Sequence, residues 1–137
     1  MAYRFEYDST NKILMCRFDG DVLFEALKRY YLIDTPRVIA RTDFRGSIVD
    51  FTNVTLFDIS PERIRELAAY PPVDPMASRL RIVVAATPHI FGLARMFELH
   101  GENTRPNLHV VSSMSQAYAL LGVTNPSFKL IEEENPS

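Results

Sequence analysis

The chain has 137 residues, of which 47% are hydrophobic and 23% are charged, and its formal net charge at pH 7 is -2. This length fits a single domain, and the composition is ordinary for a globular protein. Both halves of the chain are balanced in charge, which argues against the clustered basic surface that non-specific nucleic-acid binding needs.

The same sequence offers no obvious route into a membrane or out of the cell. Its longest aliphatic run, Ile82 to Ala86, is far too short to cross a bilayer, so we expect no membrane insertion. The N-terminal stretch MAYRFEYDS carries charges where a secretion signal needs an apolar core. Cys16 is the single cysteine, which excludes an internal disulfide. A cytoplasmic protein is the plain expectation.

The first half of the chain predicts a hairpin, a helix and a strand. Residues 3–18 read as a β-hairpin, because YRFEY alternates apolar and charged residues and KILMCRF follows the turn-like DSTN. Residues 21–34 predict an amphipathic helix that ends near Pro36. Its inward face would be Leu23, Ala26, Leu27 and Tyr30. Residues 35–47 fit either a strand or an ordered connection, and SIVDF (47–51) predicts the next strand.

The second half alternates helices with strands. Residues 60–70 predict a helix, and RLRIVVAA (79–86) is apolar on both faces, which is typical of a central strand. A third helix is expected over 87–101, with Thr87 as its cap and Gly101 as its stop. NLHVVS (107–112) predicts a strand and SMSQAYALLG (113–122) a last helix.

This order of elements predicts an α/β fold. We expect a mixed sheet of about five strands with four helices, entered through an antiparallel hairpin and continued by β-α-β units. One domain would span residues 1–123, followed by a C-terminal tail over 124–137 whose polar composition is typical of disorder. FKLI (128–131) is the part of that tail that something could hold in place.

With this order in hand, the segment VDFTNVTLFDISPERI (49–64) resembles the signature of STAS-type domains, the fold of bacterial anti-sigma-factor antagonists. Asp50 matches the strand aspartate of that signature, and Asp58 matches the aspartate of its Asp-Ser-Ser-Gly motif. Ser60 falls on the serine that a partner kinase phosphorylates in those proteins. Ile59 stands in place of the first serine, and Pro61 in place of the glycine.

The resemblance implies a non-enzymatic regulatory or protein-interaction module, with Ser60 and Asp58 as its regulatory residues. A purely structural role explains the same serine, because Ser-Pro-Glu is a strong start for a helix. A phosphate at a helix N-terminus is electrostatically favourable, whereas Pro61 removes one N–H that would hold it. Both roles for Ser60 stay open at this point.

A second functional class comes from the stretches FGLARMFE and SMSQAYALLGV, which are similar to stand-alone bacterial proteins of the STAS and CRAL-TRIO (lipid-carrier-like) superfamily. This similarity implies a carrier or sensor of a small apolar ligand. The aromatic residues of the hairpin and the first helix are compatible with it: Tyr3, Phe5, Tyr7, Phe18, Phe24, Tyr30 and Tyr31. An apolar pocket of several hundred Å³ would favour the carrier, and a filled core with a bare apolar patch would favour the interaction module.

No enzyme, cofactor or metal site is expected. The sequence has no Gly-x-Ser-x-Gly elbow and no phosphate-binding glycine loop. His89 and His100 would lie about 16 Å apart along one helix, too far to share an ion.

The third helix carries more apolar residues than one core-facing stripe needs. At 100° per residue, Ile90, Leu93, Ala94 and Phe97 form that stripe. The residues outside it predict an interaction surface, with Arg95 at its rim: Phe91, Arg95, Met96 and Leu99. We expect at least two of its three apolar side chains to be buried. The cover would be loops, the tail FKLI, or a second chain in a homodimer that binds across a two-fold axis.

Overall fold

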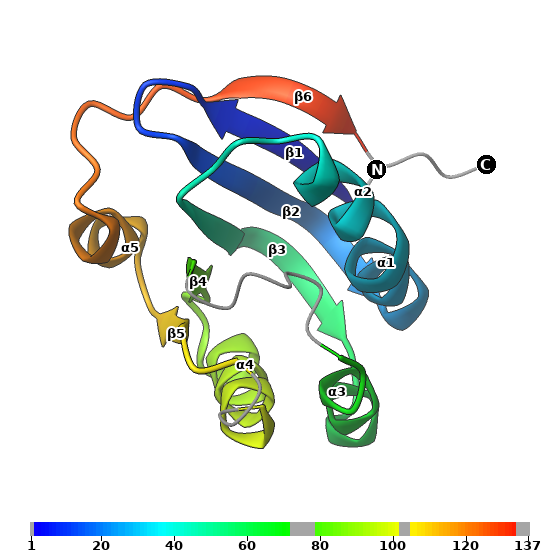
Figure 1. Cartoon of the computed structure of the whole chain (residues 1–137). Coiled ribbons are helices and arrows are strands. Elements are labelled where there is room, and N and C mark those ends of the chain that lie inside the picture. Colours follow the sequence, from blue (N-terminus) through cyan, green and yellow to red (C-terminus); the bar gives the residue numbers. More distant parts are fainter. Residues whose placement is uncertain (1, 72–78, 102–104, 134–137) are drawn as a thin grey trace.

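The computed structural model describes residues 2–71, 79–101 and 105–133. Its centre is a six-stranded mixed sheet (Figure 1) with the strand order β5-β4-β3-β2-β1-β6. The strands are β1 (Tyr3–Asp8), β2 (Ile13–Leu23), β3 (Gly46–Asp58), β4 (Leu80–Val84), β5 (Leu108–Val111) and β6 (Lys129–Glu133). β2 to β5 run parallel to one another, while β1 pairs antiparallel with both β2 and β6. The α/β class and the hairpin entry are confirmed, with one strand more than expected.

Within the described residues, four helical segments pack around this sheet, as the sequence predicts (Figure 1). The first is continuous and consists of α1 (Phe24–Arg29), the π-helical turn η1 (Tyr30–Asp34) and α2 (Thr35–Ala40). The others are α3 (Pro61–Ala68), α4 (Pro88–His100) and α5 (Met114–Leu121). The expected stop of α5 is confirmed, because Gly122 takes the left-handed conformation (φ 66°) that ends helices.

The sheet has two unlike faces. The first helical segment, α3 and α4 cover one of them, the multi-helix face, where Leu14, Cys16 and Phe18 of β2 enter the larger core. The opposite face, the α5 face, packs Ile13 and Met15 against α5 in a smaller core. Because side chains alternate along a strand, the next residue of that second set, Arg17, also lies on the α5 face.

The boundaries of the first helix differ from the prediction of 21–34. Asp21 to Leu23 belong to β2, where they pair with Leu56 to Asp58 of β3. Leu23, expected to face inward, is therefore 53% exposed. The ladder to a strand some 35 residues away outweighs the local helical pattern, which is a weak determinant by itself.

Pro36 does not end this helical segment, contrary to expectation. It lies in the first turn of α2, where its missing N–H is tolerated. Just before it, the N–H of Thr35 donates to the carbonyl of Tyr30, five residues back. The helix therefore has a wider, π-helical turn directly before the proline, and it continues beyond it. The undecided residues 35–47 are thus α2, a connection and the start of β3.

The segment expected as a disordered tail contributes a strand. Residues 129–133 form β6 and pair with β1, which would otherwise be an edge strand with unpaired backbone groups. Phe128 stacks on Tyr118 of α5, and Glu132 forms ion pairs with Arg37 and Arg41. The polar composition wrongly indicated disorder here. A strand is held by hydrogen bonds between backbone groups, and these do not require apolar side chains. Residues 134–137 of the expected tail lie outside the described residues.

β3 is much longer than the expected strand at 47–51. Its pairing with β4 stops at Asp50, and beyond that point β3 continues beside β2 as a two-stranded ribbon. The ribbon ends at Asp58, directly before α3. This extension is what carries the motif residues beyond the rest of the sheet.

Candidate functional site

Ser60 caps α3, as the sequence predicts. Its Oγ accepts a hydrogen bond from the backbone N–H of Arg63 (3.2 Å), and Pro61 occupies the first helical position. Exposed and buried residues alternate at this turn: Asp58 and Ser60 are exposed, whereas Ile59 between them is buried in the core. The buried isoleucine anchors the turn, so the two polar residues are presented together at the end of the β2–β3 ribbon.

The charges around Ser60 are mixed. Asp58 and Glu62 are exposed acidic neighbours. Arg63, one turn into α3, pairs with Glu66 (3.1 Å) and stacks its guanidinium over the ring of Phe24 at 4.5 Å. Arg63 is therefore the cation on this turn of α3, and the partial positive charge of the helix N-terminus adds to it.

Asp50 belongs to a different part of the molecule. It lies roughly 25 Å from Asp58 along an extended strand, so the structure does not bring the two motif aspartates together. Its carboxylate is only 2% exposed. Oδ2 accepts from Arg17 Nη1 (2.8 Å), and Oδ1 accepts from the backbone N–H of Thr52 (2.9 Å).

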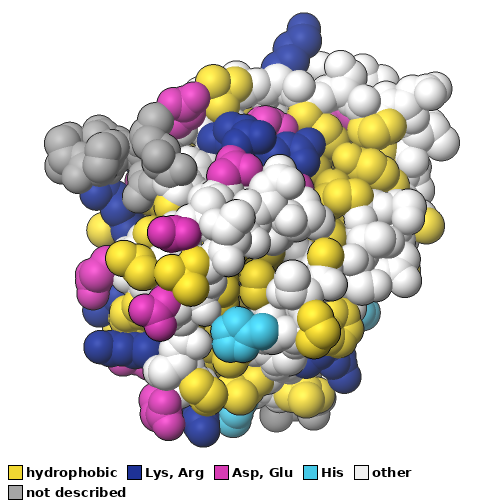
Figure 2. All heavy atoms as spheres, turned by 180° about the vertical axis from the view of Figure 1, so that it is seen from behind, with side chains coloured by type: hydrophobic (Ala, Val, Ile, Leu, Met, Phe, Trp, Pro, Cys, Tyr) yellow, Lys and Arg dark blue, Asp and Glu magenta, His cyan; other side chains and the backbone are white. Residues whose placement is uncertain are grey.

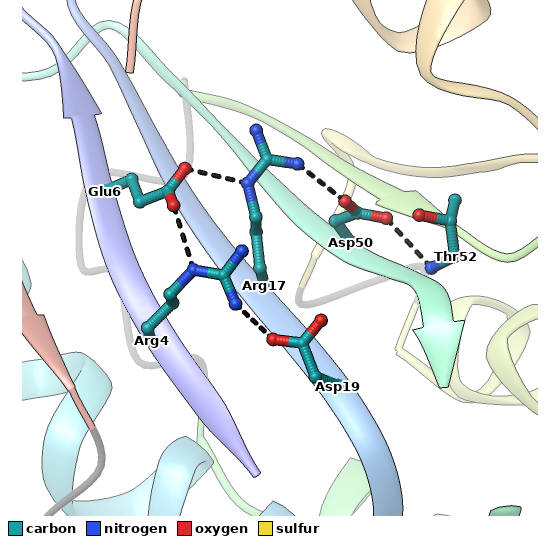
Figure 3. Close-up of polar contacts among 6 residues, drawn as sticks. All are labelled: Arg4, Glu6, Arg17, Asp19, Asp50 and Thr52. Carbon is teal, nitrogen blue, oxygen red and sulfur yellow. Dashed lines mark hydrogen bonds and ion pairs between the residues drawn. The ribbon is translucent and has the colours of Figure 1, made fainter. Parts of the chain in front are cut away.

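Asp50 is the end of a charged network that crosses three strands (Figure 3). Arg17 on β2 lies between Asp50 on β3 and Glu6 on β1, and donates from Nε to Glu6 Oε1 (2.7 Å). Glu6 also accepts from Arg4 Nε (3.0 Å), and Arg4 pairs in turn with Asp19. Burial alone would raise the pKa of Glu6, but the hydrogen bonds from both arginines outweigh it and lower that pKa. The network joins β1, β2 and β3 on the α5 face.

Figure 2, seen from behind the view of Figure 1, shows basic and acidic side chains interspersed near the top of that side of the molecule, with hydrophobic side chains beside them. The two signs of charge lie next to each other there. This side of the molecule therefore has none of the broad single-sign field that steers nucleic acid to a protein.

The expected interaction surface on α4 is only partly buried. Phe91 and Met96 are half-buried and pack against the larger core, while Leu99 is 56% exposed and Arg95 pairs with Glu98. The expectation that at least two of the three apolar residues are buried is thus not met within one chain. The tail does not cover them either, because β6 and β5 are at opposite edges of the sheet.

Two residues of that surface line a groove. Arg95 and Leu99 lie on one wall of an open surface groove of about 470 Å³ beside the edge strand β5. The other lining residues are Glu98, Arg105, Pro106, Leu108 and His109. The core stripe of α4 is confirmed: Ile90 and Leu93 are buried, and Ala94 and Phe97 are partly buried. Thr87 stands at the N-cap of α4 but makes no side-chain capping hydrogen bond.

The start of α4 is tied to the end of β3. A ring nitrogen of His89 lies 3.2 Å from the carbonyl oxygen of Phe57, next to Asp58. This contact brings the first turns of α3 and α4 to the same end of the parallel strands. Among the described residues, no cluster of three or more His, Cys, Asp or Glu side chains is arranged to hold a metal ion.

Arg105 is a buried residue that the sequence did not point to. Its guanidinium donates to the hydroxyl of Tyr31 (3.1 Å) and to the carbonyls of Ala68 (3.3 Å) and Tyr70 (2.7 Å), so it binds the C-terminal end of α3. These three partners of its side chain lie at least 35 residues away, and no local pattern signals them.

The multi-helix face has a partly open apolar cavity of about 80 Å³, lined mainly by β3, β4 and the helices η1, α3 and α4. This is far below the several hundred Å³ that would favour the carrier of a small apolar ligand. In the part of the chain that the structure describes, no helix is long and apolar enough to cross a bilayer.

Comparisons with known proteins identify a solved structure with a similar fold. No protein-family model matches the chain, and no curated protein sequence matches it. The solved structure of the anti-sigma factor antagonist SpoIIAA in its unphosphorylated form is similar, with a TM-score of 0.51 and 16% identity. The match covers 90% of this chain and 100% of that chain. A likeness at this identity shows the fold, and the chain therefore has a STAS-type fold.

Proposed function

We propose that the protein is a non-enzymatic regulatory module that binds a protein partner at the common end of β3, α3 and α4, with Ser60 as its switch and Asp58 beside it. The observation that carries this proposal is the presentation of Ser60. Its side chain is exposed at the first turn of α3, held out by the buried Ile59, in a fold shared with an anti-sigma factor antagonist.

The chemistry of a switch at this position follows from its surroundings. A phosphate on Ser60 adds a charge of roughly -1.5 to -2 at a helix N-terminus, where the helix dipole favours it. Pro61 has no N–H to donate to this phosphate, so the side chain of Arg63 would supply much of the attraction that holds it. With Asp58 and Glu62 nearby, the phosphate makes the tip strongly acidic, which repels an acidic partner surface and attracts a basic one.

The second contact region of the proposal is the α4 surface of Phe91, Arg95, Met96 and Leu99. The contact of His89 with Phe57 joins the start of α4 to the Ser60 turn, so a single partner can reach both. Leu99 and the adjoining groove give it an exposed apolar contact. A second copy of the chain is the other occupant that we propose for this surface, as a homodimer.

The test compares two substitutions that keep the cap and differ in charge. Ser60→Asp and Ser60→Asn both supply a good N-cap, and only the first adds a negative charge. The tagged protein is purified at native levels, its partner is identified by mass spectrometry, and the affinity for that partner is measured. We expect Ser60→Asp to change the affinity at least tenfold and Ser60→Asn to leave it within twofold. Equal affinities for both variants contradict the switch.

The alternative, a carrier of a small apolar ligand, has less support. The described cavity of about 80 Å³ is too small for a lipid chain and only about half the ~150 Å³ cavity that admits benzene. Any ligand that it takes is therefore small.

A further inference from the structure

Two cavities lie next to each other in the core of the multi-helix face. The larger, about 80 Å³, is apolar, and the smaller, about 20 Å³, lies toward α2. Three residues line both: Tyr30 of η1, Val49 of β3 and Arg81 of β4. The two spaces therefore adjoin each other, and the hydroxyl groups and the charged residue of the lining lie at or near their common border.

The smaller cavity has a mostly apolar lining that includes a few hydroxyl groups and no described carboxylate. Thr35 lines it and is 3% exposed, and its hydroxyl interacts with that of Tyr30 and has no other described hydrogen-bond partner. Ser47 adds a second hydroxyl to the lining. Burial raises the pKa of Tyr30 and of Cys16, so the phenol and the thiol both stay protonated at neutral pH. The cavity therefore offers several hydrogen-bond donors and no anion.

Arg81 is the one charged residue among the described lining of either cavity. Unlike Arg17, which has two carboxylate partners, its guanidinium makes no ion pair within 4.0 Å with a described residue. The nearby buried carboxylate of Asp34 is already bound by Arg37 (2.9 Å) and by the hydroxyl of Tyr3. The hydroxyl of Tyr30 is a neutral partner of Arg81, and a partly buried cation is more favourable when an anion also joins it.

We propose that the two cavities form one binding site for a small apolar carboxylic acid. The carboxylate lies in the smaller cavity, where Arg81 and Thr35 donate charge-assisted hydrogen bonds, and the hydrocarbon part fills the larger cavity. Because both cavities together are smaller than the ~150 Å³ cavity that admits benzene, the ligand has at most about six non-hydrogen atoms, the number in butanoate.

The proposed acid site does not depend on the proposed switch at Ser60. Its position nevertheless allows a bound acid to influence that switch. The larger cavity is walled by Ile64 and Leu67 of α3 and by Ile90 and Leu93 of α4. These are the helices that carry the proposed contact surface. A bound acid contacts both, so its presence favours one relative position of α3 and α4.

The experiment measures binding to the full chain by isothermal titration calorimetry and by two-dimensional NMR. Sodium butanoate is compared with butan-1-ol and butylammonium chloride at equal ionic strength, and then with ethanoate and octanoate. We expect saturable butanoate binding at least tenfold tighter than that of the alcohol or the amine. Ethanoate leaves the apolar cavity empty and octanoate exceeds it, so both bind at least tenfold more weakly than butanoate.

Variants separate the two halves of the site. Thr35→Val keeps the shape and removes the hydroxyl, Arg81→Gln removes the charge, and Ala94→Leu fills the apolar cavity. Each is expected to weaken butanoate binding at least fivefold, whereas Arg65→Gln, which changes an exposed arginine of α3, leaves it unchanged.

The competing explanation is one buried water in the smaller cavity and an empty larger one. It predicts that butanoate binds no better than butan-1-ol, and that result overturns the proposal. An unchanged affinity of Thr35→Val for butanoate also overturns the proposal. If Arg81→Gln does not fold, Thr35→Val is the variant that decides. None of these readouts involves the protein partner, so the proposed switch stands or fails separately.

Discussion

Each face of the sheet carries a partly buried strand arginine, Arg17 on one and Arg81 on the other, and the surroundings of these two differ. On the α5 face, Arg17 lies between Glu6 and Asp50, and each of these carboxylates is bound a second time, by Arg4 and by the N–H of Thr52. On the multi-helix face, Arg81 lines two cavities and makes no ion pair with a described residue. On the α5 face the charge of the arginine is neutralised by carboxylates of the neighbouring strands, which indicates a structural role. The multi-helix face has space and an unneutralised charge, which are features of a binding site.

The largest effect is expected from breaking the network of the α5 face. Arg17→Met leaves the buried carboxylate of Asp50 without its cation, and this lowers the free energy of unfolding by about 3 kcal/mol. Urea denaturation measures the loss. Asp43→Asn is the matched control, because the exposed Lys12–Asp43 pair (3.3 Å) contributes less than about 1 kcal/mol. Similar losses in both variants contradict the structural role of the network.

The pH dependence of stability sharpens the same comparison. The pKa of Glu6 is lower in the folded protein than its ordinary value, so its ion pairs stabilise the fold fully above that value. The stabilisation is lost as the pH falls through the folded pKa. From about pH 5 downward, the free energy of unfolding therefore falls more steeply in the wild type than in Glu6→Gln. Parallel curves from urea titrations at several pH values rule this out.

Removing the cap of α3 has a smaller effect. Ser60→Ala loses the hydrogen bond to the N–H of Arg63 and lowers the free energy of unfolding by about 1 kcal/mol. Ser60→Asn keeps a capping oxygen and stays within about 0.5 kcal/mol of the wild type. An unchanged urea midpoint in Ser60→Ala shows that the cap does not stabilise the fold.

The smallest effect on stability is expected on the α4 surface. Leu99→Glu changes a side chain that is 56% exposed, so the free energy of unfolding stays within about 0.5 kcal/mol of the wild type. If the chain is a homodimer through this surface, Leu99→Glu together with Met96→Glu gives a folded monomer. Light scattering of the wild type decides the point, because a monomer at high concentration excludes the dimer.

Local patterns predicted what is local in this fold. The cap at Ser60, the stop at Gly122 and the core stripe of α4 each depend on a few neighbouring residues, and all are confirmed. The errors concern long-range pairing. Residues 21–23 are a strand because of β3, and residues 129–133 are a strand because of β1.

The charged groups were harder to predict for the same reason. Arg17 is 33 residues from Asp50, and Arg105 is 74 from Tyr31, so no spacing in the sequence reveals either contact. Arg81 stands in the strongest predicted strand, but its two cavities arise only when η1, α2 and α4 pack on that strand.

The most direct test of the account is the modification state of Ser60 in native cells. Trypsin releases residues 46–63 as one peptide, which also contains Ser47, Thr52 and Thr55, so fragment ions must assign the site. The account predicts that a measurable fraction of this peptide carries a phosphate on Ser60. A well-covered peptide that is unmodified under every growth condition contradicts it and leaves Ser60 as a helix cap alone.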